Sequence, residues 1–170
     1  VMDNQIYGLT KGQLSPTSPK GLRTVSSNYG SIEDPVNPLL YVLGYGARFV
    51  AQGTPADMGG LASLIEEAIR FPGFAFVNIQ SPCVTYGQAD QQLKVQKTTM
   101  KSLASMGHDS ADRLKAMALA ADYGQALYTG VFYRDPVPPA TYDQAVVDRE
   151  HHLTDAAALR SRVLEKFQPK

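Results

Sequence analysis

Residues 74–80 read Phe-Ala-Phe-Val-Asn-Ile-Gln, and this nearly continuous apolar run decides the fold. Such a run is typical of a strand that is buried on both faces in a parallel sheet. It is followed by Ser81-Pro82-Cys83, so a cysteine stands just beyond the carboxyl end of the predicted strand. Side chains at that end of a strand line the ligand-binding edge of an open α/β sheet. The stretch therefore predicts an α/β fold with Cys83 at its functional edge.

A helix is predicted directly before this strand. Thr54 can cap it, with Pro55 at the first helical position and Asp57 at the third. Apolar residues then recur at helical spacing on one face, namely Leu61, Leu64, Ile65, Ala68 and Ile69. Pro72-Gly73 ends the helix. A helix followed by a buried strand indicates a mostly parallel sheet flanked by helices.

Shorter elements are predicted around this unit. Met2 is expected to close a strand that begins upstream, and residues 10–38, rich in Ser, Thr, Gly, Pro and Asn, are expected to form a long ordered loop. Loops of this length in compact domains usually serve a function. The other predicted elements are a helix over 39–43, a strand over 47–51, a helix over 111–123, a strand over 126–133 and helical structure over 142–167.

Two of these segments carry more specific expectations. The helix over 111–123 is expected to be capped by Asp109 or Ser110 and to place Leu114, Met117, Ala118 and Ala121 on one apolar side. The last segment mixes charged residues with apolar ones and is expected to extend as an arm over a partner. We therefore predict one domain over residues 1–135 and a helical extension over residues 136–170.

Composition excludes several classes of protein. The chain has 170 residues, 44% of them hydrophobic, which suits one globular core. Its 16 basic and 16 acidic residues leave no net charge, so no nucleic-acid or membrane partner is expected. No apolar run approaches the roughly 18 residues of a membrane span, and no secretion signal is recognisable. The single cysteine fits a reducing compartment, and we expect a cytoplasmic location.

The remaining polar groups do not form a recognisable catalytic motif. His108 lies beside a glycine, and His151-His152 lie in a charged stretch without the spacing of metal ligands, so a solvated position is expected for all three. Glu66-Glu67 is expected on the exposed flank of its helix. No Ser-His-Asp, Walker or zinc-ribbon spacing is present.

The strongest functional motif lies at residues 3–13, Asp-Asn-Gln-Ile-Tyr-Gly-Leu-Thr-Lys-Gly-Gln, followed by Ser-Pro-Thr at 15–17. With this motif, the chain closely resembles the beta subunit of 2-oxoacid:ferredoxin oxidoreductases, which are thiamine diphosphate enzymes. Later blocks of that subunit match in the same order, at residues 73–77, 81–85 and 130–133. The resemblance implies part of a thiamine diphosphate-binding fold, here its carboxyl-terminal part.

The resemblance also assigns roles within the first motif. The Asn4 side chain and the Ile6 backbone carbonyl would hold Mg²⁺ against the cofactor's diphosphate, which agrees with the preference of Mg²⁺ for oxygen ligands shared with phosphate. The third protein ligand of the family is an aspartate in an upstream Gly-Asp-Gly motif, which these residues lack. Further cofactor contacts are expected from Tyr7, Gly8, Leu9 and Thr10.

Plainer interpretations of these residues stay open. Asn4 can be a turn residue at a strand end, and Tyr7 can be a packed aromatic. Lys11 is expected to contact the carboxylate of an acidic substrate, with a solvated lysine as the alternative.

Cys83 has two interpretations. A lone cysteine at a strand end is usually a small buried hydrophobe. The resemblance instead makes it the fourth thiolate of a [4Fe-4S] cluster, whose other three ligands lie upstream in the family, two of them in a Cys-x-x-Cys pair. Such a cluster needs four thiolates, so the chain by itself is not expected to hold one. The sequence departs from the family after this block, since it reads Tyr86-Gly87 where an aromatic-Asn pair is commoner.

The expected activity is therefore the oxidative decarboxylation of a 2-oxoacid to acyl-CoA, with 2-oxoglutarate favoured over pyruvate. The expected partners are the alpha subunit, ferredoxin, the 2-oxoacid and coenzyme A. The chain by itself is expected to be inactive. The rivals are a non-redox thiamine-dependent decarboxylase or synthase, which would not need Cys83, and a catalytically silent module that only folds against a partner.

Overall fold

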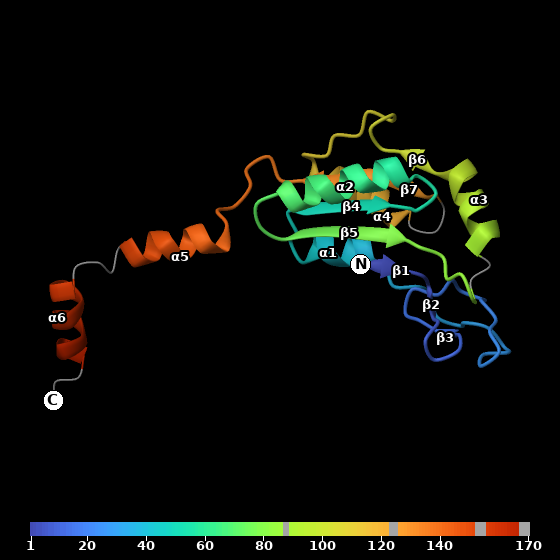
Figure 1. Ribbon diagram of the computed structural model, residues 1–170, viewed down its shortest axis with the longest axis horizontal. Helices are drawn as coiled ribbons and strands as arrows, with labels where there is room; N and C mark the ends of the chain where they lie inside the picture. The colour runs from blue at the N-terminus through green and yellow to red at the C-terminus, as the bar shows by residue number, and fades with distance from the viewer. Residues whose placement is uncertain (87–88, 123–125, 152–155, 167–170) are drawn as a thin grey trace.

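The computed structural model describes residues 1–86, 89–122, 126–151 and 156–166 (Figure 1). Its centre is a five-stranded sheet in the order β1-β5-β4-β7-β6. The strands are β1 (Met2–Asp3), β4 (Phe49–Gly53), β5 (Ala75–Gln80), β6 (Lys101–Ser102) and β7 (Tyr128–Arg134). Neighbouring strands run parallel except for β4 and β7. The predicted mostly parallel α/β sheet is thus confirmed.

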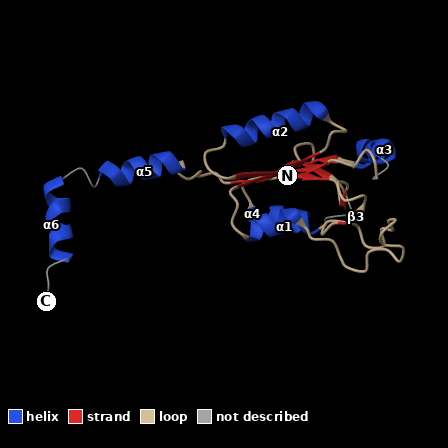
Figure 2. Cartoon of the chain, turned by 60° about the horizontal axis from the view of Figure 1, so that its bottom comes forward, coloured by secondary structure: helices blue, strands red, loops and turns tan. Residues whose placement is uncertain are grey.

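Helices cover both faces of the sheet (Figure 2). On one face lie α1 (Pro38–Gly44) and α4 (Arg113–Ala121), and on the other lies α2 (Met58–Arg70). The larger core cluster joins α1 and α4 to the sheet through Leu39, Leu43, Val50, Ala116 and Phe132, all at most 1% exposed. A smaller cluster under α2 centres on Phe49 and Phe71, whose rings lie 5.4 Å apart. The result is a three-layer α/β/α body.

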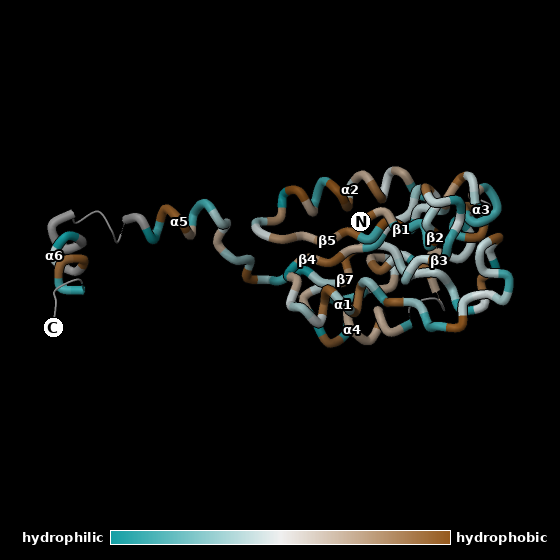
Figure 3. The backbone as a smooth tube through the Cα atoms, turned by 90° about the horizontal axis from the view of Figure 1, so that it is seen from below, coloured by the Kyte–Doolittle hydropathy of each residue, from teal (hydrophilic) through white to brown (hydrophobic). Residues whose placement is uncertain are grey.

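The central strand β4 is completely buried, whereas β5 is less buried than predicted. All five residues of β4 are buried. In β5, Ala75, Phe76 and Val77 are half-buried, and Phe74, just before the strand, is 66% exposed. The polar residue Asn78 is the fully buried one. In Figure 3, β4 and β5 are nevertheless coloured mainly as hydrophobic, in contrast to the paler region around the short strands β2 (Ile6–Tyr7) and β3 (Gln13–Leu14).

Helix α2 confirms the predicted helix, but its cap was predicted wrongly. The helix begins at Met58, and its N-cap is Asp57, whose carboxylate accepts a hydrogen bond from the Gly60 N–H at 3.0 Å. Thr54 is not the cap because its hydroxyl is used elsewhere: it accepts from the Ala56 N–H at 3.2 Å and donates to Gln96 Oε1 at 2.5 Å. The helix starts one short turn later than the Thr-Pro pair indicated.

The cap and buried side predicted for α4 were also wrong. Its N-cap is Asp112, neither Asp109 nor Ser110, and the helix ends at Ala121, while Tyr123 lies outside the described residues. Ala116 and Ala120 face the core, and Met117 is only partly buried. The larger Leu114 is 77% exposed, and Ala118 and Ala121 are also exposed. Small alanines on this side let α4 pack directly against α1.

Four elements were not predicted. They are the short strands β2 and β3, the helix α3 (Ala89–Thr99) and the short strand β6 that follows it. Strand β3 lies within residues 10–38, which were predicted as a loop. Helix α3 carries little apolar periodicity, with only Ala89 buried, so hydrophobic spacing could not reveal it. The predicted strands over 47–51 and 126–133 are present but begin two residues later, at Phe49 and Tyr128.

The chain ends in two helices, α5 (Tyr142–His151) and α6 (Ala156–Lys166). Among the described residues, neither contacts another helix or strand, and Figure 1 shows both extending away from the sheet. Helical structure in this segment is thus confirmed, whereas a domain boundary after residue 135 stays a prediction. Gly87, His152, Leu153 and Phe167 lie outside the described residues. In the part of the chain described, no helix is long and apolar enough to cross a membrane.

Candidate functional site

The candidate site is built on the loop that leaves β1 at the carboxyl edge of the sheet. β1 pairs in parallel with the end of β5, Met2 opposite Ile79 and Asp3 opposite Gln80. The pairing continues one residue further, because the Ser81 N–H donates to the Asp3 carbonyl at 2.9 Å. This register places the residues 3–13 motif next to the segment that contains Cys83.

Asp3 anchors the beginning of the loop. It is only 7% exposed, and its Oδ1 accepts from the Thr17 hydroxyl at 2.6 Å and from the Gln5 N–H at 3.1 Å. Its Oδ2 accepts from Gln80 Nε2 at 3.1 Å. A buried carboxylate is tolerated only when donors surround it in this way. Asp3 thereby ties the first motif, the Ser-Pro-Thr block and β5 together.

Ser18 adds a second tie to the same loop. Its hydroxyl donates to the Gln5 carbonyl at 2.6 Å and accepts from the Ser15 N–H at 2.8 Å. Ser18 is 2% exposed. The residue between the two predicted Mg²⁺ ligands is therefore held by its backbone from both sides.

Asn4 and Ile6 are placed close together by the backbone of Gln5. Gln5 has φ +58°, a left-handed conformation that is rare for a residue with a side chain. Asn4 Oδ1 accepts a hydrogen bond from the Ile6 N–H at 3.2 Å, so the amide oxygen folds back over the turn. The Asn4 side chain is exposed, and an amide oxygen can accept more than one partner.

The oxygen ligands that this turn offers suit a Mg²⁺ ion that is also bound by phosphate oxygens, rather than an ion bound by protein groups alone. Mg²⁺ takes oxygen ligands and normally keeps waters or phosphate oxygens in its shell. The described residues contain no group of three or more His, Cys, Asp or Glu side chains that could hold a metal ion. The Asn4 amide and the Ile6 carbonyl are two neutral oxygens, which fit an ion held in part by a cofactor's diphosphate.

A tight turn follows, between β2 (Ile6–Tyr7) and β3 (Gln13–Leu14). The Lys11 N–H donates to the Gly8 carbonyl at 3.1 Å, and the Gly12 N–H donates to the Tyr7 carbonyl at 2.9 Å. Lys11 has φ +74°. The turn projects its side chains outward: Leu9 is completely exposed, Tyr7 is 52% exposed, and Thr10 and Lys11 are exposed. Tyr7 is therefore not a packed core aromatic in this chain.

Cys83 lies against the glycines of this turn. A β-carbon built on Gly8 would stand 3.3 Å from Cys83 Sγ. A β-carbon on Gly12 would stand 3.1 Å from the Tyr86 ring, which therefore covers the turn from the same side. Cys83 itself is half-buried. The structure thus brings together two motifs that are about 70 residues apart in the sequence.

Two cavities adjoin the loop. The first, of about 600 Å³, is lined by Asn4, Gln5, Ile6, Lys11, Gly12, Pro19, Leu22, Arg23, Thr24, Val25, Asn28, Tyr86 and Gln92. The second, of about 780 Å³, shares Gln5 and Pro19 with the first, and half of its lining residues carry amide or hydroxyl side chains, among them Gln52, Gln80 and Gln96. Both therefore meet at the loop that carries the first motif.

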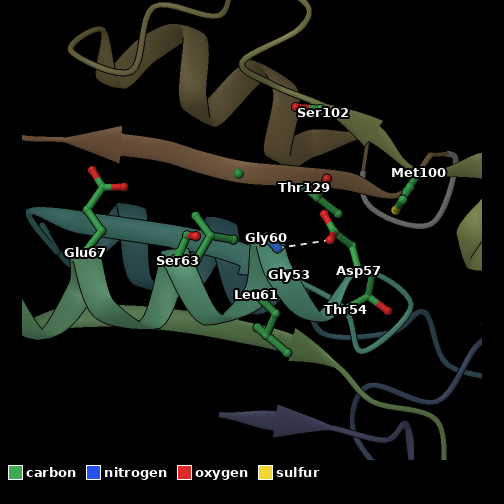
Figure 4. A pocket seen from close by; sticks show the side chains of 12 residues that line it. Gly53, Thr54, Asp57, Gly60, Leu61, Ser63, Glu67, Met100, Ser102 and Thr129 are labelled. Atoms are coloured by element: carbon green, nitrogen blue, oxygen red, sulfur yellow. Dashed lines mark hydrogen bonds between the residues drawn. The ribbon is translucent and has the colours of Figure 1, made fainter.

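A third cavity lies away from these residues, beside the start of α2 (Figure 4). It is smaller, about 260 Å³, and Asp57, Ser63, Glu67 and Thr129 are among its lining residues. Glu67 forms an ion pair with Arg134 at 2.6 Å, and Glu66 forms one with Arg70 at 2.8 Å. Both glutamates are thus used in ion pairs. The predicted exposed flank is confirmed for Glu66, whereas Glu67 is half-buried against β7.

His108 is not on a solvated face, contrary to the prediction. Its Nε2 lies 2.7 Å from the Phe132 carbonyl, and the residue is partly buried. The ring therefore links the loop after β6 to strand β7. His151 closes α5, and His152 lies outside the described residues.

Sequence reasoning missed several residues of the site. Asp3, Thr17 and Ser18 stabilise the loop, and Arg23 lines the first cavity. Asp3 and Thr17 lie inside the two amino-terminal motif blocks. The presence of both blocks was therefore a signal from which a contact between these two residues could have been predicted. Arg23 had no comparable signal, since it is one basic residue in a long polar loop.

Two different protein-family models match the two parts of the chain that contain the motifs. A family model described as "Thiamine pyrophosphate enzyme, C-terminal TPP binding domain" matches residues 1–79. A second family model, for the C-terminal part of the beta subunit of pyruvate ferredoxin oxidoreductase, matches residues 83–158. The first contains the 3–13 motif and the second begins at Cys83.

Individual proteins give the same result. A 2-oxoacid:ferredoxin oxidoreductase subunit beta of Saccharolobus solfataricus is 29% identical over 91% of this chain and 53% of its own length. The 2-oxoglutarate synthase subunit KorB of Methanothermobacter marburgensis is 34% identical over 81% of this chain and 47% of its own length. The chain spans about half the length of the curated relatives it matches.

A solved structure shares the fold over nearly the whole chain. It is a 2-oxoglutarate:ferredoxin oxidoreductase from Magnetococcus marinus with 2-oxoglutarate, coenzyme A and succinyl-CoA bound. The two chains superpose with a TM-score of 0.80 at 36% identity, over 99% of this chain and 57% of the other.

Proposed function

The chain belongs to the beta-subunit family of 2-oxoacid:ferredoxin oxidoreductases, and we propose that it supplies one half of that enzyme's thiamine diphosphate site and one ligand of its iron–sulfur cluster. The proposed reaction is oxidative decarboxylation of a 2-oxoacid to acyl-CoA, with electrons passed to ferredoxin. The observation that carries the proposal is the contact between Gly8, in the cofactor motif, and Cys83.

In the cofactor site, Asn4 Oδ1 and the Ile6 carbonyl are the proposed Mg²⁺ ligands. Asp3 and Ser18 fix the backbone between them, so both oxygens are positioned before the ion binds. The backbone of Tyr7, Gly8, Leu9 and Thr10 is proposed to lie against the diphosphate. Bound thiamine diphosphate supplies the nucleophilic carbon and the electron sink for decarboxylation, and a [4Fe-4S] cluster supplies one-electron transfer.

The cysteine completes the redox part of the proposal. Cys83 is the single cysteine of the chain, so it contributes one of the four thiolates and the others come from elsewhere in the complete enzyme. Because Gly8 has no side chain, Cys83 Sγ can lie directly against the turn that holds the cofactor. This closeness favours a short electron path from the cofactor to the cluster, which a non-redox thiamine enzyme would not need.

Lys11 is the proposed contact for the substrate carboxylate. It is exposed on the same turn and lines the same cavity as Asn4 and Ile6. The names of the relatives, which include 2-oxoglutarate synthase and 2-oxoglutarate oxidoreductase subunits, favour 2-oxoglutarate over pyruvate as substrate. An alpha subunit and ferredoxin are the proposed protein partners, and the cytoplasm is the proposed location.

The body and the arm are proposed to have different tasks. Residues 1–135 would hold the cofactor and cluster ligands, and residues 136–170 would contact a partner. The lack of contacts from α5 and α6 to the other described elements favours this division.

The test is a pair of variants in the complete oxidoreductase. In C83S, we expect iron and acid-labile sulfide to fall and ferredoxin reduction to be lost, while thiamine diphosphate stays bound. In N4A, we expect the opposite pattern, with iron retained and the Kd for thiamine diphosphate in Mg²⁺ raised at least 10-fold, because one of the ion's two proposed ligands in this chain is removed. A C83S enzyme with full iron and full activity would show that Cys83 has only a packing role.

A further inference from the structure

Arg23 lines the same cavity as Lys11, Asn4 and Ile6, about 600 Å³ in volume. The other described residues around this cavity are uncharged, so its only ionic groups are two cations. Such a cavity favours a ligand that carries negative charge, and two cations favour a ligand with two anionic groups.

The position of Arg23 is fixed although it lies in the long loop. On one side, the Gly21 N–H donates to the Ser31 carbonyl at 2.7 Å and the Ser31 N–H donates to the Leu22 carbonyl at 3.0 Å. On the other side, Thr24 and Ser27 exchange two backbone hydrogen bonds, at 3.3 and 3.1 Å. Arg23 therefore stands between two backbone pairs of one narrow hairpin, at a position that lines the cavity.

Neither cation of the cavity forms an ion pair within the described part of the chain, whereas their loop neighbour Lys20 pairs with Asp34 at 2.9 Å. Lys20 does not line the cavity. The positive charge of Arg23 and Lys11 is therefore available to a ligand, and their exposure keeps both groups hydrated until it arrives.

We infer that Arg23 binds the second carboxylate of a dicarboxylic 2-oxoacid while Lys11 receives the first, so that Arg23 sets the preference for 2-oxoglutarate over monocarboxylic 2-oxoacids. This inference rests on the proposed function. A guanidinium matches a carboxylate through two parallel N–H···O bonds, which an ammonium cannot provide. When a monocarboxylic substrate binds, Arg23 stays hydrated at little cost in free energy, and that substrate therefore gains no binding free energy from Arg23.

The experiment compares R23Q, R23K and K20Q with the wild-type complete enzyme. The measured quantities are kcat/KM for 2-oxoglutarate and for 2-oxobutyrate, together with the Kd for thiamine diphosphate in Mg²⁺. For R23Q, we expect kcat/KM for 2-oxoglutarate to fall about 10- to 100-fold, the usual range for loss of a charged hydrogen bond. The value for 2-oxobutyrate and the cofactor Kd should not change. R23K should recover part of the loss, and K20Q should resemble the wild type.

Each other outcome overturns the inference. An equal loss with both substrates means that Arg23 does not distinguish them, and no loss means that it does not bind substrate. A raised Kd for thiamine diphosphate means that Arg23 serves the diphosphate instead. A wild-type enzyme that contains no thiamine diphosphate, or decarboxylates neither acid, overturns the proposed function itself, which separates that failure from a failure of Arg23 alone.

Discussion

Gly8 and Cys83 lie so close together that a β-carbon on Gly8 would stand 3.3 Å from Cys83 Sγ. The closeness follows from the register of β1 and β5, which brings both segments out of the sheet at the same edge. The absence of a side chain at Gly8 is therefore needed for packing, since its φ does not lie in the left-handed region where only glycine is favoured.

G8A is expected to destabilise the chain by about 1 kcal/mol, because Cys83 or the turn must move by a few tenths of an ångström to admit the methyl group. Urea unfolding followed by circular dichroism measures the change. The matched control is G44A in α1, where no atom lies within 4 Å of the added carbon. G44A should be neutral or stabilising, since alanine is the better helix former. Equal effects of the two variants would contradict the packing role of Gly8.

T17V is expected to weaken both the fold and the cofactor site. The Thr17 hydroxyl donates to buried Asp3 at 2.6 Å, and valine leaves that carboxylate oxygen with one donor fewer. Loss of a hydrogen bond to a charged group costs about 1.5–3 kcal/mol. We expect a lower free energy of unfolding and, in the complete enzyme, a raised Kd for thiamine diphosphate in Mg²⁺.

T17S keeps the hydroxyl and serves as the control for T17V. It should recover most of the stability and most of the cofactor affinity. A T17S chain as weak as T17V would show that the methyl group, and not the hydrogen bond to Asp3, is what the site requires.

The main strands and helices could be predicted where hydrophobic spacing was strong, whereas helix caps that depend on polar contacts could not. Strand β5 and helix α2 follow from their apolar patterns, although β5 is less buried than its pattern predicts. The cap of α2 could not be predicted, because the choice between Thr54 and Asp57 depends on Gln96, which lies 42 residues from Thr54 and accepts its hydroxyl. Helix α3, which supplies Gln96, has too weak an apolar pattern to be detected.

In the candidate site, the motifs could be predicted from the sequence, but the contacts between them could not. The motif around Asn4 and the block around Cys83 could be identified separately in the sequence, but their contact depends on the parallel pairing of β1 with β5. Arg23 reaches the cavity of Lys11 through backbone pairing within a loop that has no repeating pattern. In α4, four residues at helical spacing predicted the wrong buried side, because packing against α1 selects the small Ala116 and Ala120.

The start of α2 offers a matched pair of glycines. A β-carbon on Gly60 would collide with the Asp57 carboxylate, whereas one on Gly59 would stand 3.9 Å from it. G60A is therefore expected to displace the cap and to cost about 1 kcal/mol. G59A should stabilise the helix by about 0.5–1 kcal/mol through its better propensity. Thermal unfolding of both variants measures the difference, and a Tm for G60A at or above that of G59A would contradict the capping role of Asp57.

Asp112 is expected to make stability depend on acid pH. Hydrogen bonds from the Lys115 N–H, at 3.1 Å, and from its ammonium group hold the pKa of the Asp112 carboxyl below its ordinary value of 3.8. Because the folded pKa is the lower one, the stabilising effect is complete above pH 3.8 and is lost as the pH falls through the folded pKa. D112N should lower the Tm at pH 7 and reduce the difference between the Tm at pH 7 and the Tm at pH 3. If this difference is the same as in the wild type, the Asp112 carboxylate does not contribute to the pH dependence of stability.

Lys11 allows backbone strain to be separated from side-chain charge. Its φ of +74° is unfavourable for any residue except glycine, at a cost of roughly 1 kcal/mol. K11G removes this strain together with the charge, while K11A removes the charge and keeps the strain. We expect K11G to be more stable than both K11A and the wild type in urea unfolding. In the complete enzyme, both variants should raise KM for the 2-oxoacid about 10-fold or more, because each lacks the ammonium group. If K11A and K11G kept the wild-type KM, Lys11 would be a solvated lysine, and the strain at this turn would have no connection with substrate binding.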